Sequence, residues 1–193
     1  MASPHPAAGL PRAAHERLAR ASAALLAAVA LTACGQQTAP GHVASVTEFS
    51  ENGVVVRMSV ADWKASAGTL VTTFTPDEPG FHLYSTTLPA QGVDGVGRPT
   101  EVRPAGSITV AGGMTVDKPV TTIDVPGVLS VVPVYPDGPV TVTLPIRATA
   151  PGEAKVLVTY ASCSSTEGCT IPVLGRAVTL RTDEDVLSFD APG

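Results

Sequence analysis

Histidine, cysteine and tryptophan, which often build functional sites, are scarce in this chain. Its 193 residues include four histidines, three cysteines and one tryptophan. His5 and His15 lie within the first twenty residues and His42 in a polar segment, so only His82 lies in the β-rich part. A multi-histidine metal site is therefore excluded. A catalytic triad would have to use His82, without the Gly-x-Ser-x-Gly turn that positions a nucleophilic serine. We interpret His82 as structural.

Aromatic side chains are also rare, at 4% of residues, and charged side chains make up 15%. The core must then be built from Val, Leu, Ile and Ala, and we expect Trp63 to be a core ring. The formal net charge of −5 comes without any basic stripe, so we expect no nucleic-acid partner. The acid pairs Asp77–Glu78 and Asp183–Glu184 are typical of solvated surface. No phosphate-binding glycine loop precedes a helix, and we expect no cofactor.

No apolar run is long enough to span a bilayer, which needs roughly 20 residues. The longest, residues 21–33, follows three arginines and ends in small residues. That order is typical of a secretory signal. Leu31-Thr32-Ala33-Cys34-Gly35 resembles the lipobox of bacterial lipoproteins, which implies that Cys34 is lipidated. We predict a signal peptide at 1–33 and a lipidated Cys34 with a flexible tether at 34–45. The protein would then be anchored at the cell membrane, facing the extracytoplasmic side. The alternative is a signal cut elsewhere, with Cys34 an ordinary thiol.

From residue 46 to about 190 the chain alternates short β-rich runs with Pro/Gly turns. The runs cover residues 54–60, 69–75, 81–86, 107–110, 140–146, 156–160 and 177–180. Val- and Thr-rich runs of this length fit half-buried strands. Seven such runs predict an all-β domain, an immunoglobulin-like β-sandwich. We expect at most one helical turn at 60–68 and a long loop at 87–104.

The remaining cysteines, Cys163 and Cys169, flank the tip of a predicted hairpin. If they face each other across it, they are close enough to bond, and outside the cytoplasm the bond can persist. A ring of this size should stabilise the fold by only about 2.4 kcal/mol on the chain-entropy estimate. Spacing alone leaves a redox role and a structural role open. A metal site is disfavoured because no third ligand lies nearby in the sequence.

The residues around the cysteines resemble a known family. The pattern Tyr160-x-x-Cys163-x₅-Cys169-x-x-Pro172 is similar to the N-terminal periplasmic domain of DsbD, the thiol:disulfide interchange protein. The strand Gly80-Phe-His-Leu-Tyr84 resembles that family's early Gly-aromatic-x-Leu-Tyr strand. The likeness extends over roughly residues 50–182.

The resemblance implies an immunoglobulin-like domain whose cysteine pair passes electrons. Cys169 would join partners in a mixed disulfide and Cys163 would resolve it. The implied partners are thioredoxin-like proteins or disulfide isomerases. A separate membrane electron carrier would supply the electrons. The chain departs from the family at Gly168, where a large side chain is usual, and at Thr170-Ile171. Residues 128–135 are the nearest candidate for the family's aromatic cap loop.

Three functional hypotheses follow. The first is a membrane-anchored thiol–disulfide exchange domain, an electron shuttle acting as a protein-disulfide oxidoreductase. The second is a non-enzymatic binding or scaffold lipoprotein with a structural disulfide. The third is a copper or cytochrome assembly factor, which the poverty of histidine and methionine in the domain disfavours.

Overall fold

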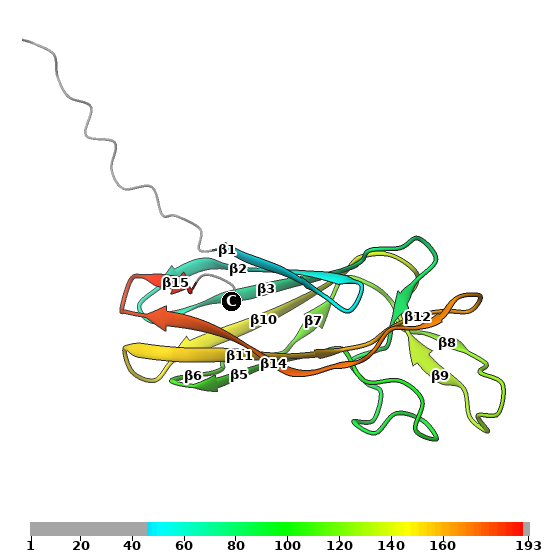
Figure 1. The fold of residues 1–193 in the computed structure, drawn as a ribbon. Helices are drawn as coiled ribbons and strands as arrows, with labels where there is room; N and C mark the ends of the chain where they lie inside the picture. The colour runs from blue at the N-terminus through cyan, green and yellow to red at the C-terminus, as the bar shows by residue number, and fades with distance from the viewer. Residues whose placement is uncertain (1–45, 191–193) are drawn as a thin grey trace, which may run out of the picture. The chain divides into compact units, whose positions relative to one another are not determined.

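The computed structural model describes residues 46–190. All regular structure in this range is β-strand, and the strands are antiparallel. Two sheets stack as layers, and short strands gather at one end of the pair (Figure 1). The predicted all-β sandwich is therefore confirmed. The predicted signal peptide, Cys34 and the tether lie outside the described residues. Residues 46–190 contain no helix with the length and apolar character that a membrane span requires.

The larger sheet has the order β1-β2-β3-β10-β6, with β7 also paired to β10. Its strands are β1 (Val46–Glu51), β2 (Val54–Lys64), β3 (Ala67–Pro76), β6 (Ile108–Val110), β7 (Thr115–Val116) and β10 (Val140–Ala148). Buried and exposed positions alternate along β2 and β10, as the two-residue period of a half-buried strand requires. One face of this sheet therefore lies against the second layer.

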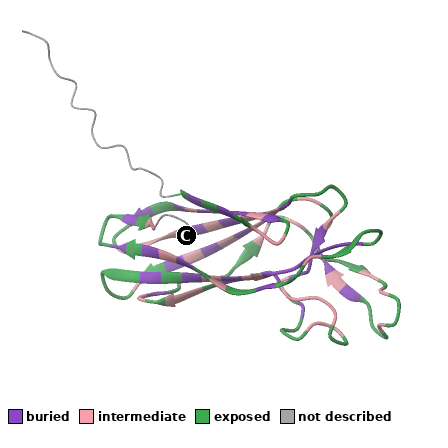
Figure 2. Cartoon of the chain, in the orientation of Figure 1, coloured by how far each residue is buried: buried purple, intermediate pink, exposed green. Residues whose placement is uncertain are grey.

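The second layer has the order β15-β14-β11-β5. Its strands are β5 (Glu101–Gly106), β11 (Gly152–Tyr160), β14 (Val173–Thr182) and β15 (Leu187–Phe189). Buried aliphatic side chains from both layers form the main core, seen as purple bands along the strands in Figure 2. Phe74 and Tyr160 meet edge to face in this core, with ring centroids 5.5 Å apart. Trp63 belongs to the same core, as predicted.

Short strands extend the sandwich at one end. They are β4 (His82–Leu83), β12 (Ser162–Ser164) and β13 (Gly168–Cys169), paired β13-β12-β4, and the hairpin of β8 (Thr121–Ile123) and β9 (Val132–Val134). A bridge between Tyr84 and Val134 connects the two groups. A second, smaller apolar cluster, which includes Tyr84, Val134 and Cys163, lies here. Cys163 therefore lies in a core separate from the main one.

The segment 60–68, for which at most one helical turn was expected, holds none, because β2 and β3 form a hairpin whose turn residues Ala65 and Ser66 have positive φ, the conformation that tight hairpins require. Two other local expectations were wrong. The predicted strand 81–86 shortens to β4, since the backbone beyond Leu83 leaves β12 and bonds to the β9 segment. The predicted loop 87–104 ends at residue 100, because β5 begins at Glu101 as an edge strand that tolerates Pro104.

Candidate functional site

Cys163 and Cys169 are joined in a disulfide across the β12–β13 hairpin. The two residues are direct cross-strand partners, with Cα atoms 4.0 Å apart. The backbone N–H of Thr170 donates to the carbonyl oxygen of Ser162, and the N–H of Ser162 donates to the Thr170 hydroxyl. These bonds hold the two strands together on one side of the pair, and the pairing of Ser164 with Gly168 does so on the other. The departure at Gly168 has a backbone reason, because its φ of +93° is a conformation that side chains disfavour.

The two sulfur-bearing residues differ in exposure. Cys163 is 4% exposed and belongs to the smaller apolar cluster, whereas Cys169 is an exposed residue on the outer strand. A protein thiol approaching from solvent would therefore meet Cys169 first. The disulfide is asymmetric because its outer half is accessible and its inner half is held in the protein.

Tyr84 contacts the inner sulfur. Its hydroxyl oxygen lies 2.9 Å from Sγ of Cys163 and 3.8 Å from Sγ of Cys169. The ring is buried, and burial raises the pKa of the Tyr84 phenol above its ordinary value of 10.0. The phenol therefore stays protonated and is a hydrogen-bond donor aimed at the sulfurs. Among the described residues of this apolar cluster, Tyr84 alone places a polar side-chain group against the sulfurs.

The backbone of Tyr84 is held on both sides. Its carbonyl oxygen accepts hydrogen bonds from the hydroxyl and the N–H of Thr100, at 2.7 and 3.3 Å. On either side of Tyr84, the Ser85 N–H donates to the carbonyl oxygen of Pro133, and the Tyr135 N–H donates to that of Leu83. The phenol is thereby carried by a backbone that two other segments of the chain fix in place.

His82 lies opposite Cys163 in the β4–β12 pair and is 7% exposed. Its Nδ1 lies 3.8 Å from an Asp137 carboxylate oxygen, and its ring meets that of Tyr84 edge to face, with centroids 6.0 Å apart. Burial lowers the pKa of His82 and the Asp137 carboxylate opposes this shift. The imidazole is thus neutral near pH 7, and it forms part of the packing around the disulfide.

The other residues of the cysteine pattern lie away from the sulfur contacts. Tyr160 is fully buried in the main core, where its hydroxyl donates to the Glu51 carbonyl oxygen, and burial raises its pKa. Pro172 is exposed beyond β13. The acid pairs Asp77–Glu78 and Asp183–Glu184 are exposed, as expected for solvated surface.

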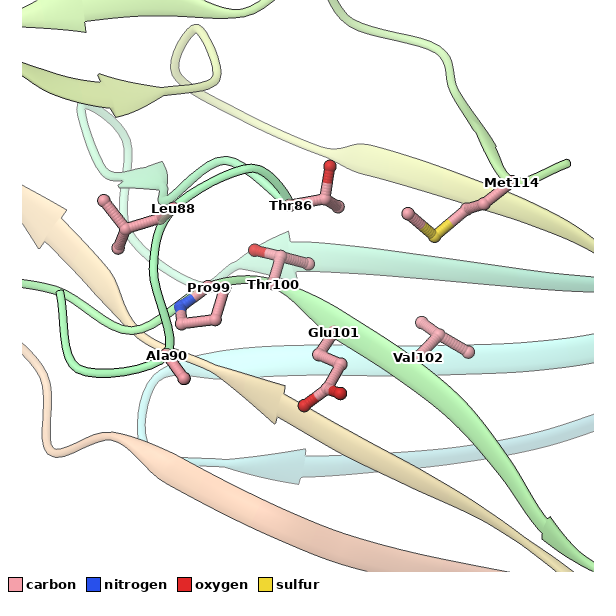
Figure 3. A pocket seen from close by; sticks show the side chains of 8 residues that line it. All are labelled: Thr86, Leu88, Ala90, Pro99, Thr100, Glu101, Val102 and Met114. Carbon is pink, nitrogen blue, oxygen red and sulfur yellow. The ribbon is translucent and has the colours of Figure 1, made fainter.

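A pocket of about 290 Å³ opens beside the segment that leads into β5 (Figure 3). Leu88, Thr100 and Met114 are among its lining residues, and neither cysteine lines it. Its one charged side chain, Glu101, pairs with Arg103 at 3.4 Å. The pocket therefore does not converge on the disulfide. Within the described range, no three His, Cys, Asp or Glu side chains group closely enough to hold a metal ion.

Comparison with solved structures identifies the fold. The N-terminal periplasmic domain of ScsB from Proteus mirabilis matches 77% of this chain with a TM-score of 0.50 and 15% sequence identity. The two share a fold. The match covers 54% of the ScsB chain, so this chain spans about half of that protein domain's length. The reduced DsbD N-terminal domain of Neisseria meningitidis aligns over 71% of this chain and 90% of its own, with 15% identity and a TM-score of 0.44. No family model matches the chain, and no curated protein matches it.

Tyr84 has no role predicted from the sequence, although it lies in the segment that carries the resemblance. Residues 128–135 are the cap-loop candidate predicted from the sequence. Val132 and Val134 of that segment do belong to the cluster around the disulfide. A second segment, residues 85–100, packs on the Tyr84 ring as well. Tyr84 meets a cysteine 79 positions later through the pairing of distant strands, and no local sequence pattern indicates that contact.

Proposed function

We propose that this chain is an extracytoplasmic thiol–disulfide exchange domain in which Cys163 and Cys169 form the reactive pair. The observation that carries the proposal is the asymmetric disulfide, whose outer residue is exposed and whose inner sulfur contacts the protonated Tyr84 phenol. The shared fold with a periplasmic ScsB domain supports the proposal.

The exchange is an ordinary transfer of two electrons. A thiolate of a partner dithiol protein attacks Sγ of Cys169, the bond between Cys163 and Cys169 breaks, and Cys163 leaves as a thiolate. The partner's second thiolate then attacks its own sulfur in the mixed disulfide and releases Cys169 as a thiolate. The partner ends as a disulfide and this chain as a dithiol. The same steps in reverse reduce a second partner's disulfide.

The Tyr84 phenol supplies what the leaving sulfur needs. A buried thiolate is costly unless a donor stabilises it, and a hydrogen bond to a charged group is worth about 1.5–3 kcal/mol. Donation from Tyr84 stabilises the thiolate of Cys163 and makes it the better leaving group. Attack at Cys169 is then favoured both by access and by the departure of Cys163.

Thioredoxin-like proteins or disulfide isomerases are the proposed partners, with a membrane electron carrier as the other side of the exchange. We also propose that Cys34 is lipidated and anchors the chain at the cell membrane. Replacing Cys34 by Ser should then release the protein from the membrane fraction. Retention of the Cys34→Ser protein in that fraction would argue for a different anchor.

The deciding experiment measures the reduction potential of the Cys163–Cys169 bond in the purified protein. The protein is equilibrated in thiol–disulfide buffers, and alkylation of each cysteine is read by peptide mass. A potential of roughly −120 to −270 mV lies in the range of oxidoreductases and supports the exchange function. A potential below about −300 mV marks a structural disulfide and favours the binding or scaffold alternative.

A further inference from the structure

The ring of Tyr84 is covered by the segment 85–100, and the closest approach is at Gly97. A Cβ placed on Gly97 would lie 2.6 Å from Cε1 and 2.7 Å from Cδ1 of Tyr84, and 2.9 Å from Cδ2 of Leu88. Real side chains do not approach so closely. The segment touches the ring at this depth only because position 97 has no side chain.

This segment is braced internally by Arg98 and tied to a neighbouring hairpin by Asp94. The Arg98 guanidinium donates to the carbonyl oxygens of Gln91, Gly95 and Gly97. The Asp94 carboxylate accepts a hydrogen bond from the Leu129 N–H at 3.0 Å, which joins the segment to the β8–β9 hairpin. The backbone at Gly97 therefore cannot retreat by itself without breaking bonds of Arg98. The segment cannot retreat as a whole without breaking the bond to Leu129 or the bonds between Thr100 and the Tyr84 carbonyl oxygen.

We propose that Gly97 is a positioning residue, which holds the Tyr84 phenol against Sγ of Cys163 and thereby sets the reactivity of the cysteine pair. The biological role of this contact rests on the proposed function. The contact itself can be tested separately, because the reactivity of the thiols is measurable without any partner protein. The hydroxyl lies at the far end of the ring from the backbone. A small tilt of the ring at the Gly97 contact therefore becomes a larger displacement at the sulfur.

Two matched substitutions separate this contact from backbone strain. Gly97 and Gly95 have φ of +82° and +85°, so alanine is strained at either position. A Cβ on Gly95 would meet nothing within 4 Å, whereas one on Gly97 would meet the Tyr84 ring. Gly97→Ala and Gly95→Ala thus share the strain and differ in the collision.

The readout is the pH profile of alkylation of Cys163 by iodoacetamide in the reduced protein, resolved by peptide mass. Loss of one hydrogen bond to a charged group corresponds to a change of about tenfold in the ionisation constant. We expect Gly97→Ala to raise the pKa of the Cys163 thiol by this amount. At a pH above that raised pKa, it should also shift the equilibrium with glutathione toward the disulfide by about tenfold. Gly95→Ala should follow the wild-type profile.

The same pair is then compared in a Tyr84→Phe background. If Gly97 acts through the phenol, Gly97→Ala should leave the Cys163 profile of Tyr84→Phe unchanged. An equal shift with and without the hydroxyl, or an equal shift in Gly95→Ala, would overturn the proposal.

Arg98→Gln keeps the test decisive if Gly97→Ala does not fold. It removes the bonds that brace the Gly97 backbone and introduces no collision, so it should also raise the pKa of the Cys163 thiol, and only where Tyr84 keeps its hydroxyl. A wild-type profile in Arg98→Gln would count against the positioning role. The two proposals can fail separately. If the pKa shifts of Cys163 appear but the reduction potential of the Cys163–Cys169 bond lies below about −300 mV, Gly97 keeps its positioning role and the exchange function is rejected.

Discussion

The hydroxyl oxygen of Tyr84 lies 2.9 Å from Sγ of Cys163, although the two residues are 79 positions apart in the chain. The contact exists because β4 pairs with β12, and the next residue after β4 turns its ring into the cluster around the disulfide. It gives one sulfur of the pair a hydrogen-bond donor at close range. The chemistry expected of the pair follows from this asymmetry.

Replacing Tyr84 by Phe should make the disulfide harder to reduce. The Cys163 thiolate loses a donor worth about 1.5–3 kcal/mol, so the pKa of the Cys163 thiol should rise by about 1–2 units. At a pH above the raised thiol pKa, the reduction potential should fall by about 30 mV or more, since 30 mV corresponds to about tenfold for two electrons. Equilibration with glutathione measures the shift. Tyr135→Phe is the matched control, because its hydroxyl bonds to Thr86; equal shifts in both variants would argue against the contact.

The exposed cysteine should be the one that forms mixed disulfides. We compare Cys163→Ser, which leaves Cys169, with Cys169→Ser, both carrying Cys34→Ser so that one thiol is counted. At about pH 9, above the ordinary thiol pKa of about 8.5, access decides the rate. We expect the free Cys169 to react with an aromatic disulfide roughly tenfold faster than the free Cys163. Equal rates would show that the burial of Cys163 does not shield it.

Acid should destabilise the fold through His82. Its pKa is lowered in the folded protein below 6.5, its ordinary value, so the unfolded chain binds a proton that the folded chain does not. The free energy of unfolding should therefore fall as the pH drops below 6.5, and this loss should end below the folded pKa. Urea midpoints between about pH 8 and about pH 5 measure it.

In His82→Phe this part of the pH dependence should vanish, because the ring no longer titrates. Asp137→Asn should lower the His82 pKa further, since the carboxylate is the group that raises it. The loss of stability would then continue to lower pH. An unchanged slope in His82→Phe would assign the acid sensitivity to other groups.

The main core should respond to loss of Phe74 independently of the cysteines. Phe74 is fully buried and packs edge to face on Tyr160. Replacing it by Ala should lower the free energy of unfolding by about 3–5 kcal/mol. Leu129→Ala, at a side chain 97% exposed, should change it by less than about 0.5 kcal/mol. Urea titration of the oxidised proteins compares the two, and similar losses would contradict the assignment of the core.

Six of the seven predicted runs coincide with strands, because alternating Val and Thr residues fit only a half-buried pleated surface. Strands that depend on a distant partner were missed. β5 carries Pro104 and is a strand because its backbone pairs with β11 at a sheet edge. The β2–β3 turn was also missed, since Ala65 and Ser66 are not typical residues for positive φ.

The sequence by itself determined the all-β class and the spacing of Cys163 and Cys169, because both depend on local pattern and on residues six positions apart. Only the tertiary structure decided which cysteine is buried, that the Tyr84 hydroxyl reaches its sulfur, and that Gly97 leaves no room for a side chain beside the Tyr84 ring. These relations join β4, β12 and the segment 85–100, which are far apart in the chain. Their contacts follow from sheet pairing and close packing, and no local pattern of residues specifies which distant segments will meet.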